Sequence, residues 1–283
     1  MKLEGKVAIV SAAGRGIGRA IALCLAEEGA DLVVNSYRDE TTAAVAGEIK
    51  AFGRRVLAVP GDVTDPDMIS KIVDKSIDTF GKVDILVNNV GGGKPVPKEA
   101  NSGHLGELVA RWDGTYEQSL RAPALMCETV APVFMEQRSG KIVSIGSIGG
   151  RGTPTLMSLT HTASPAYCAM KAGLIVYTQT LAERLGPYNV NVNCICPGMI
   201  HTDAWKGTSR RLVETVPDFK GLEPDELVAG AMEGRFPQMF RSTPLRRAAT
   251  AESIGRAVVF LVSEDGKDIT GQSLNVDSGM VKN

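Results

Sequence analysis

Tyr167 and Lys171 are residues whose types and spacing suit acid–base chemistry. On a helix, residues four apart share a face, with Cβ atoms about 5–6 Å apart. A tyrosine titrates near a pKa of about 10, and a neighbouring ammonium group stabilises the phenolate and lowers that value. The pair therefore predicts a general acid and base that works near neutral pH. Because many helices carry a core tyrosine beside a solvated lysine, the position of the pair in the fold has to decide.

A glycine-rich turn, SAAGRGIG at 11–18, follows a short apolar run and opens a helical pattern. The glycines Gly14, Gly16 and Gly18 allow the backbone to approach a pyrophosphate group. The helix N-terminus adds free N–H groups and the positive end of a dipole. The order of strand, glycine turn and helix predicts a dinucleotide site, and the alternative is a tight turn without a ligand.

Short apolar runs alternate with helical patterns, and this order must position both motifs. The runs are nearly continuous, as is typical of strands buried on both faces. We predict an α/β fold, a Rossmann-type doubly wound, predominantly parallel seven-stranded sheet with helices on both faces, in a single domain over 1–283. The expected strands are Lys6–Val10, Asp31–Asn35, Val56–Val59, Val83–Asn88, Lys141–Ile145, Val190–Ile195 and 272–276, and the expected helices are 17–28, 39–52, 65–80, 105–136, 164–185 and 251–263.

Two stretches interrupt this alternation. Residues 90–104 are rich in glycine and proline and predict a loop near the carboxyl end of a strand. Residues 198–244 form a long excursion with a helix expected at 224–234, and its aromatic content favours a lid. We expect a partly apolar pocket wall there, with packing of the excursion on the body as the alternative; its members would be Trp205, Phe219, Phe236, Met239 and Phe240.

Composition excludes several classes of protein. The 283 residues carry 31 Lys and Arg against 32 Asp and Glu, a net charge of −1, so we expect no nucleic-acid or membrane-surface partner. No apolar run approaches the roughly 18–20 residues that cross a bilayer. The five cysteines lie in apolar contexts, which is typical of reduced thiols in a cytoplasmic protein. Cys194 and Cys196 share a strand face, but no second pair completes a zinc site, so no metal is expected.

Five further segments, in order, resemble motifs of the short-chain dehydrogenase/reductase family, over nearly the whole chain. The glycine turn is similar to its TGxxxGxG motif, and Tyr167 and Lys171 match its YxxxK pair. The other matches are NNVG at 88–91, the strand IVSIGS at 142–147, VNCICPG at 192–198, TGQ at 270–272 and NVDSG at 275–279.

The resemblance implies a role for each matching residue. Tyr167 would transfer the proton, Lys171 would lower its pKa and bind the nicotinamide ribose, and Ser147 would hold the substrate carbonyl or alkoxide. Tyr167 and Lys171 would also contact the cofactor. The other residues expected to do so are Ser11, Gly14, Arg15, Gly16, Ile17, Gly18, Ser36, Arg38, Asp62, Val63, Asn89, Gly91, Pro197, Gly198, Ile200 and Thr202.

Three of the chain's departures from the family pattern bear on the site. Ala12 replaces a glycine, and because alanine tolerates positive φ poorly, we expect a different backbone geometry there. Ser119 stands where the family has an asparagine, which anchors a water that links the lysine to solvent as a proton relay. With serine in that place, the relay persists, is rerouted or is weakened. Ser119 remains a candidate catalytic residue. Ser147 and Tyr167 lie 20 positions apart, more than is typical, which predicts an enlarged loop within Arg151–Ser164 over the substrate pocket.

The end of the second strand indicates which cofactor binds. NAD enzymes place an acid there to hold the ribose hydroxyls, whereas this chain has Ser36. Arg38 and Arg15 could hold a 2′-phosphate through their guanidinium groups, or they are solvated surface charges. We predict NADP(H) over NAD(H).

These features predict an oxidoreductase that interconverts a ketone and a secondary alcohol on a small, partly apolar substrate. One alternative is a 3-oxoacyl-(acyl-carrier-protein or CoA) reductase, although the charges of 198–244 nearly cancel and offer no patch for an acidic carrier. Another is a non-catalytic NADP(H)-binding sensor or scaffold. The resemblance also implies a homo-oligomer, a tetramer or dimer, formed through helices 105–136 and 164–185 and the last strand.

Overall fold

The fold is given by a computed structural model that describes residues 1–93, 104–152, 164–200, 202, 209–210, 212–214, 216–232, 235 and 243–282. Seven strands form one sheet in the order β3-β2-β1-β4-β5-β6-β7, and every neighbouring pair is parallel. This confirms the predicted doubly wound α/β fold. The strands are β1 Val7–Val10, β2 Asp31–Ser36, β3 Val56–Pro60, β4 Ile85–Asn88, β5 Gly140–Ile145, β6 Val190–Pro197 and β7 Ser273–Val276.

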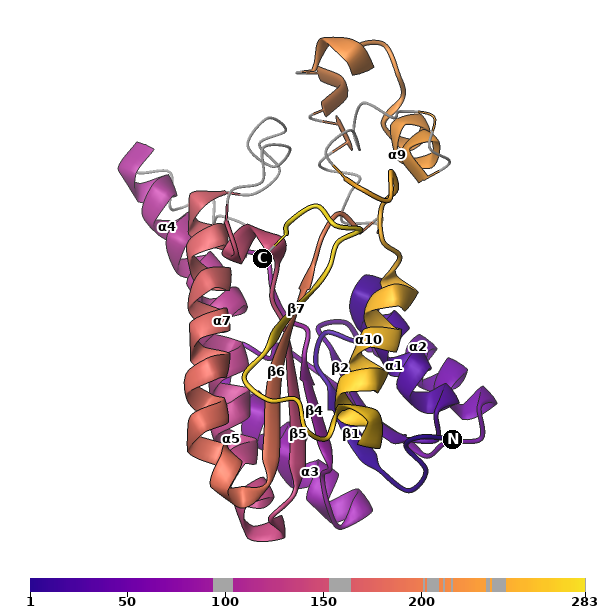
Figure 1. The fold of residues 1–283 in the computed structure, drawn as a ribbon, viewed down its shortest axis with the longest axis vertical. Helices are drawn as coiled ribbons and strands as arrows, with labels where there is room; N and C mark the ends of the chain where they lie inside the picture. The colour runs from indigo at the N-terminus through magenta and orange to yellow at the C-terminus, as the bar shows by residue number, and fades with distance from the viewer. Residues whose placement is uncertain are drawn as a thin grey trace.

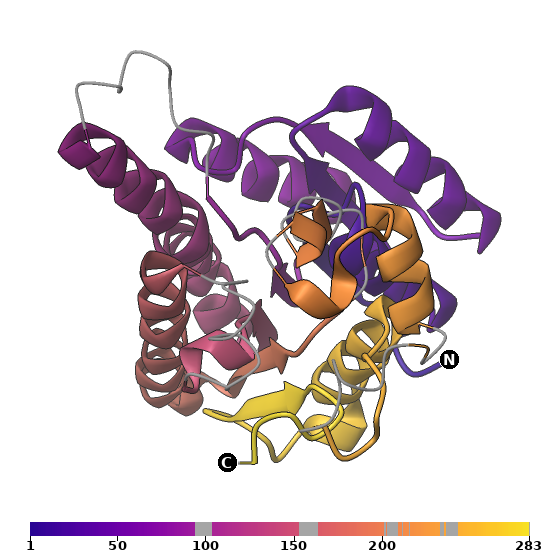
Figure 2. The same ribbon diagram turned by 90° about the horizontal axis from the view of Figure 1, so that it is seen from above.

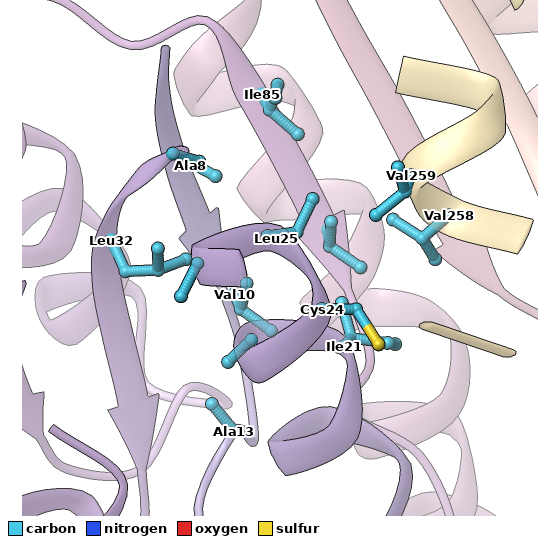
Figure 3. Packing of buried hydrophobic residues seen from close by; sticks show 14 of the residues in the cluster. Ala8, Val10, Ala13, Ile21, Cys24, Leu25, Leu32, Ile85, Val258 and Val259 are labelled. Carbon is cyan, nitrogen blue, oxygen red and sulfur yellow. The ribbon is translucent and has the colours of Figure 1, made fainter. Parts of the chain in front are cut away.

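Helices cover both faces of the sheet (Figure 1). One face carries α1 (Gly16–Glu27), α2 (Asp39–Ala51) and α10 (Ala251–Val262), and the other carries α3 (Pro66–Phe80), α5 (Ala122–Gln137) and α7 (Pro165–Leu185). Figure 3 shows Ile21 and Leu25 of α1 packed with Val258 of α10 over the strands. The strand order reverses between β1 and β4, and in such sheets the crevice outside the carboxyl ends at this reversal binds the ligand.

The helix expected at 105–136 is interrupted in the structure. It consists of α4 (His104–Tyr116), a π-turn at Glu117–Arg121 and α5, so the prediction of one regular helix was wrong. Pro123 lacks an N–H group and cannot donate the α-helical hydrogen bond to the carbonyl of Ser119, four residues earlier. A wider turn is a common solution to such a conflict, and π-turns are frequent at functional sites.

The described part of the excursion 198–244 lies above the edge of the sheet where β6 ends (Figures 1 and 2). It includes a 3₁₀ turn, Pro217–Phe219, and α9 (Pro224–Met232), which confirms the helix predicted near 224–234. Phe219 is 4% exposed and packs in a small cluster with Met199, Leu212 and Leu227. For Phe219, packing of the excursion therefore replaces the expected pocket wall.

Several expectations fall outside the described residues. They are the remaining proposed wall residues Trp205, Phe236, Met239 and Phe240, most of the loop 90–104, and positions 153–163 of the enlarged loop. Within the described ranges, no helix is long and apolar enough to cross a membrane. All five cysteines are free thiols. The single-domain organisation stays a prediction.

Candidate active site

The start of α7 presents the tyrosine–lysine pair at the carboxyl edge of the sheet. Ser164 caps this helix, because its Oγ accepts a hydrogen bond from the amide of Tyr167 at 3.2 Å, and Pro165 occupies the first helical position. Both residues favour a helix start at this point. Sequence reasoning gave Ser164 no such role, although the Ser–Pro pair was the available signal.

Ser147 lies beside Tyr167, close enough for its side chain to lower the tyrosine pKa. Ser147 follows β5 and caps a short 3₁₀ turn, Ile148–Gly150, where its Oγ accepts from the amide of Gly149 at 3.1 Å. Burial raises the pKa of Tyr167, and the side chain of Ser147 acts in the opposite direction. This differs from the expectation that Lys171 lowers the tyrosine pKa, because in this geometry desolvation of the phenolate outweighs the stabilising contacts.

Lys171 is held at the end of β5 and is 2% exposed. Its Nζ donates a hydrogen bond to the carbonyl of Ile145 at 2.7 Å and lies 5.8 Å from the ring centre of Tyr167. Burial lowers the pKa of Lys171 to about 8. Gly91 also approaches closely, since a Cβ atom there would lie 2.7 Å from Nζ. Lys171 therefore contacts the ends of β4 and β5 beside the tyrosine.

Cys194 and Cys196 of β6 form the wall behind these residues. Their thiols lie over Gly146, where a Cβ atom would come within 2.7 Å of Cys194 Sγ and 3.2 Å of Cys196 Sγ. They are fully buried in a cluster with Ile148 and Ile175. Both thiols raise the pKa of Lys171, against the larger effect of burial. Sequence reasoning placed the two cysteines on one face but did not find this contact, which depends on the pairing of β5 with β6.

Ser119 lies beside the glycine segment that follows β4. It is fully buried, and its hydroxyl donates to the carbonyl of Gly92 at 2.8 Å and accepts from the amide of Gly92 at 3.0 Å. The Ser119 hydroxyl thus gives its only proton to Gly92, and a relay water would have to donate to its remaining lone pair; the fate of the relay stays a prediction.

The glycine turn keeps a left-handed residue at Ala12, with φ of 49°. The expectation that alanine forces another geometry at this position was wrong. The turn is held on both sides of Ala12, since Asn89 Nδ2 donates to the Ala12 carbonyl at 3.1 Å and the Ala13 amide donates to Asn35 at 2.7 Å. Surrounding bonds of this kind can impose a backbone conformation that costs roughly 1–3 kcal/mol.

At two of the three glycines of the turn, Gly14 and Gly18, a side chain would collide with the protein itself. A Cβ atom at Gly14 would lie 2.3 Å from Ser36 Oγ, and one at Gly18 would lie 2.3 Å from the Ala12 carbonyl oxygen. Gly16 has φ of 55° and faces Thr202, 3.4 Å from the position of a Cβ atom. Arg15 stands at the N-cap position of α1, whose first turn contains Ile17. A helix N-terminus with this close backbone approach fits the phosphates of a dinucleotide.

Some predicted cofactor residues use their side chains within the protein. The buried Ser11 hydroxyl accepts from the amide of Asn89 at 3.0 Å and donates to the carbonyl of Val87 at 3.5 Å, which ties β1 to β4. Asp62 accepts from the amide and hydroxyl of Thr64 at 2.9 and 2.8 Å, beside the buried Val63. A ligand would meet the backbone of Ser11 rather than its hydroxyl.

The predicted cofactor residues after β6 also pack largely within the protein. Pro197 ends the strand, and Gly198 packs against Asp277, where a Cβ atom would come within 2.6 Å of Asp277 Cβ. Ile200 is 4% exposed, forms a bridge with Ala249 and packs in the core. Thr202 is the described residue of this segment that faces the glycine turn.

The end of β2 carries no acid. Ser36 closes the strand, with its Oγ 3.2 Å from Thr41 Oγ1. Arg38 and Arg15 stand at the N-cap positions of α2 and α1 without a side-chain capping bond, and both are exposed. Within the described residues neither guanidinium forms an ion pair. The nearest carboxylate along the chain is Asp39, in the first turn of α2.

Comparison with known proteins decides the family. The family model described as short chain dehydrogenase matches residues 6–212, and the model described as Enoyl-(Acyl carrier protein) reductase matches residues 227–281. The chain belongs to the short-chain dehydrogenase/reductase family. It is therefore an oxidoreductase of the class that uses a nicotinamide cofactor.

The relatives of this chain are named for different substrates. It is 34% identical to cyclohexanol dehydrogenase of Rhodococcus sp. (strain TK6), covering 99% of this chain and 97% of the other. It is 31% identical to 3-oxoacyl-[acyl-carrier-protein] reductase FabG of Escherichia coli (strain K12), covering 99% of both chains.

Two solved structures share the fold along the whole chain. L-sorbose reductase of Gluconobacter frateurii, in complex with NADPH and L-sorbose, has a TM-score of 0.80 at 28% identity and covers 100% of both chains. A 7α-hydroxysteroid dehydrogenase, in complex with NADH and 7-oxo glycochenodeoxycholic acid, has a TM-score of 0.78 at 30% identity. That alignment covers 100% of this chain and 96% of the other.

Proposed function

We propose that this enzyme interconverts a ketone and a secondary alcohol on a small, partly apolar substrate, using NADP(H), with Tyr167 as general acid and base. The observation that carries the proposal is the convergence of Ser147, Tyr167 and Lys171 at the carboxyl edge of the sheet. When bound, the cofactor supplies the hydride for reduction and accepts it in the reverse direction. The similarity to a cyclohexanol dehydrogenase supports this substrate class.

Each side chain has a separate task in the proposed mechanism. The Ser147 hydroxyl orients the substrate oxygen beside Tyr167, whose pKa it lowers. In reduction, the Tyr167 hydroxyl donates its proton to the forming alkoxide, and in oxidation the phenolate removes the proton of the alcohol. The charge of Lys171 stabilises the phenolate, and its bond to Ile145 keeps Nζ on that side of the ring.

The choice of NADP(H) rests on the end of β2. Ser36 offers no carboxylate to repel a phosphate, and Arg15 and Arg38 lie at the starts of α1 and α2. A guanidinium fork suits a phosphate group. The solved relatives include one complex with NADPH and one with NADH, so the local charges carry this part of the proposal.

A 3-oxoacyl thioester reductase is the second candidate, because FabG of Escherichia coli matches 99% of this chain. An assay of the purified enzyme with NADPH and either cyclohexanone or acetoacetyl-CoA separates the two. We expect a higher kcat/KM with the cyclic ketone. Faster turnover of the thioester would favour the second candidate. NADPH binding without turnover of either class would support a non-catalytic sensor.

We also propose that the enzyme forms a homo-oligomer through α4 and α7. Apolar residues three or four positions apart make one exposed face of α4, and Val176 of α7 is 60% exposed. A Val109→Glu substitution on this face should lower the molar mass measured by light scattering, whereas an unchanged mass would exclude α4 from the interface. The face consists of Leu105, Leu108, Val109, Trp112 and Tyr116.

The cytoplasm remains the location we propose. The five free thiols support it, because such thiols persist where glutathione keeps cysteines reduced. Fractionation of the producing cells tests this assignment, and recovery of the enzyme with a membrane or secreted fraction would contradict it.

A further inference from the structure

Residues 277–281 form a turn that the side chains of Asn275 and Asp277 hold in place. We name this turn the C-terminal hook. The buried carboxylate of Asp277 accepts the amide of Gly279 at 2.9 Å through Oδ1 and the amide of Val281 at 2.7 Å through Oδ2. Asn275 Nδ2 donates to the carbonyl of Val281 at 3.2 Å. Bonds to an ionised acceptor are stronger than neutral ones, so Asp277 fixes the direction of the hook.

Both ends of the excursion 198–244 rest on the hook. At the first end, Gly198 packs directly on Asp277, leaving no room for a Cβ atom. At the second end, a Cβ atom at Gly279 would lie 2.8 Å from Pro244, and the amide of Leu245 donates to the carbonyl of Ser278 at 3.3 Å. The hook is thus the place where the excursion leaves the body and returns to it.

Met280 of the hook joins two separate apolar clusters. It packs against the cluster of the excursion, which contains Met199 and Phe219. It also packs against the cluster of Ile148 with Cys194 and Cys196 behind the active site, and Ile148 follows Ser147 directly. A methionine side chain is flexible and fills irregular gaps, which suits a contact between two surfaces of different origin.

We propose that Met280 limits the size of the group that the enzyme accepts beside Ser147, and that Asp277 is the positioning residue that holds Met280 there. The proposal rests on the proposed function, since it concerns the substrate of that site. Ile148, the neighbour of Ser147, shares an apolar cluster with Met280, so a substrate group that extends from Ser147 toward the excursion would meet Met280. Met280 links the wall behind Ser147 to that excursion, so its volume limits the space available.

A series of ketones tests the size limit. The probes are cyclopentanone, cyclohexanone and 4-tert-butylcyclohexanone with NADPH. For Met280→Ala, we expect kcat/KM for the bulkiest ketone, relative to cyclopentanone, to rise about tenfold or more, mainly through KM, as for added apolar groups in a pocket. Met280→Leu, which conserves volume, and Lys282→Ala, just beyond the hook, should leave the ratio within about twofold. An unchanged ratio in Met280→Ala would overturn the proposal.

Amide hydrogen exchange of the full chain tests the packing without any turnover. Exchange in 216–232 should become faster, on the order of tenfold, in both Met280→Ala and Asp277→Asn and stay unchanged in Lys282→Ala, because local opening follows the loss of packing. If the unaltered enzyme reduces no ketone, the proposed function is wrong. Unchanged exchange in 216–232 of Met280→Ala would, independently of that result, overturn the role proposed for Met280. If Asp277→Asn fails to fold, Met280→Ala decides.

Discussion

Ser119 holds Gly92 by both of its backbone groups, donating to the carbonyl at 2.8 Å and accepting from the amide at 3.0 Å. The π-turn at Glu117–Arg121 contains Ser119, so the irregularity of the helix and the glycine segment after β4 are connected through one hydroxyl. Gly91, the neighbouring residue, lies against Lys171. The serine therefore acts on the lysine through the backbone of the glycine segment.

Replacing Ser119 by alanine should lower both stability and turnover. Two partly buried backbone groups of Gly92 lose their partner, and an unsatisfied group that is fully buried costs about 1–3 kcal/mol. The free energy of unfolding in urea and kcat measure the two effects. Ser76→Ala is the matched control, because its buried hydroxyl donates to Ile72 in α3 at 2.6 Å, far from the site. Full activity and stability in Ser119→Ala would contradict the role.

Replacing Tyr167 by phenylalanine should remove proton transfer. We expect ketone reduction to fall by about 10²- to 10⁴-fold, the usual contribution of a general acid or base. NADPH affinity, measured by fluorescence, should change little. Tyr177→Phe on the same helix is the control, since its hydroxyl bonds to Glu128 at 2.9 Å instead of to the site. Retained turnover in Tyr167→Phe would show that another group moves the proton.

Ketone reduction should weaken as the pH rises through about 8. Burial lowers the pKa of Lys171 to about 8, so above this pH the ammonium that stabilises the phenolate of Tyr167 is lost. The pH profile of kcat/KM reports this group in the free enzyme. A profile that stays flat from pH 7 to about 9 would contradict the assignment.

The same lysine should make stability depend on pH. Between about 8 and its ordinary 10.5, the unfolded chain holds a proton on Lys171 that the folded chain has released. Stability therefore rises with pH across this window, and the cost of the buried charge is fully present below it. Lys171→Met should remove the rise in the unfolding free energy, whereas Lys50→Met on the exposed side of α2 should keep it.

Arg38→Ala should weaken NADPH binding more than NADH binding. Loss of a charge-assisted bond to the 2′-phosphate costs about 1.5–3 kcal/mol, or roughly 10- to 100-fold in Kd. The control is Arg55→Ala. Arg55 precedes β3 at the amino ends of the strands, away from the carboxyl ends where the cofactor is proposed to bind, so both affinities should stay unchanged. Equal losses for both cofactors, or tighter binding of NADH by the unaltered enzyme, would refute the NADP(H) preference.

Most elements of the fold follow from local patterns in the sequence. The apolar runs predicted all seven strands within about two residues, because the strands of a parallel sheet covered on both faces are rich in apolar residues. The start of α3 also follows from neighbouring residues. Asp65 caps the helix by accepting a hydrogen bond from the amide of Asp67 at 3.0 Å, and Pro66 occupies the first helical position. The π-turn was missed, although Pro123 was visible, because a proline also fits a helix start or a kink.

The candidate site, like the fold, has features that follow from the sequence and features that depend on tertiary contacts. The sequence by itself determined the family and the parallel sheet, and it predicted Ser147, Tyr167 and Lys171 as the catalytic residues, because these depend on residue types at fixed spacings. Only the tertiary structure decided that Ala12 adopts a positive φ, that burial raises the Tyr167 pKa, and that Ser119 bonds to Gly92. Each of these outcomes depends on groups far apart in the chain, since hydrogen bonds and desolvation act between neighbours in space.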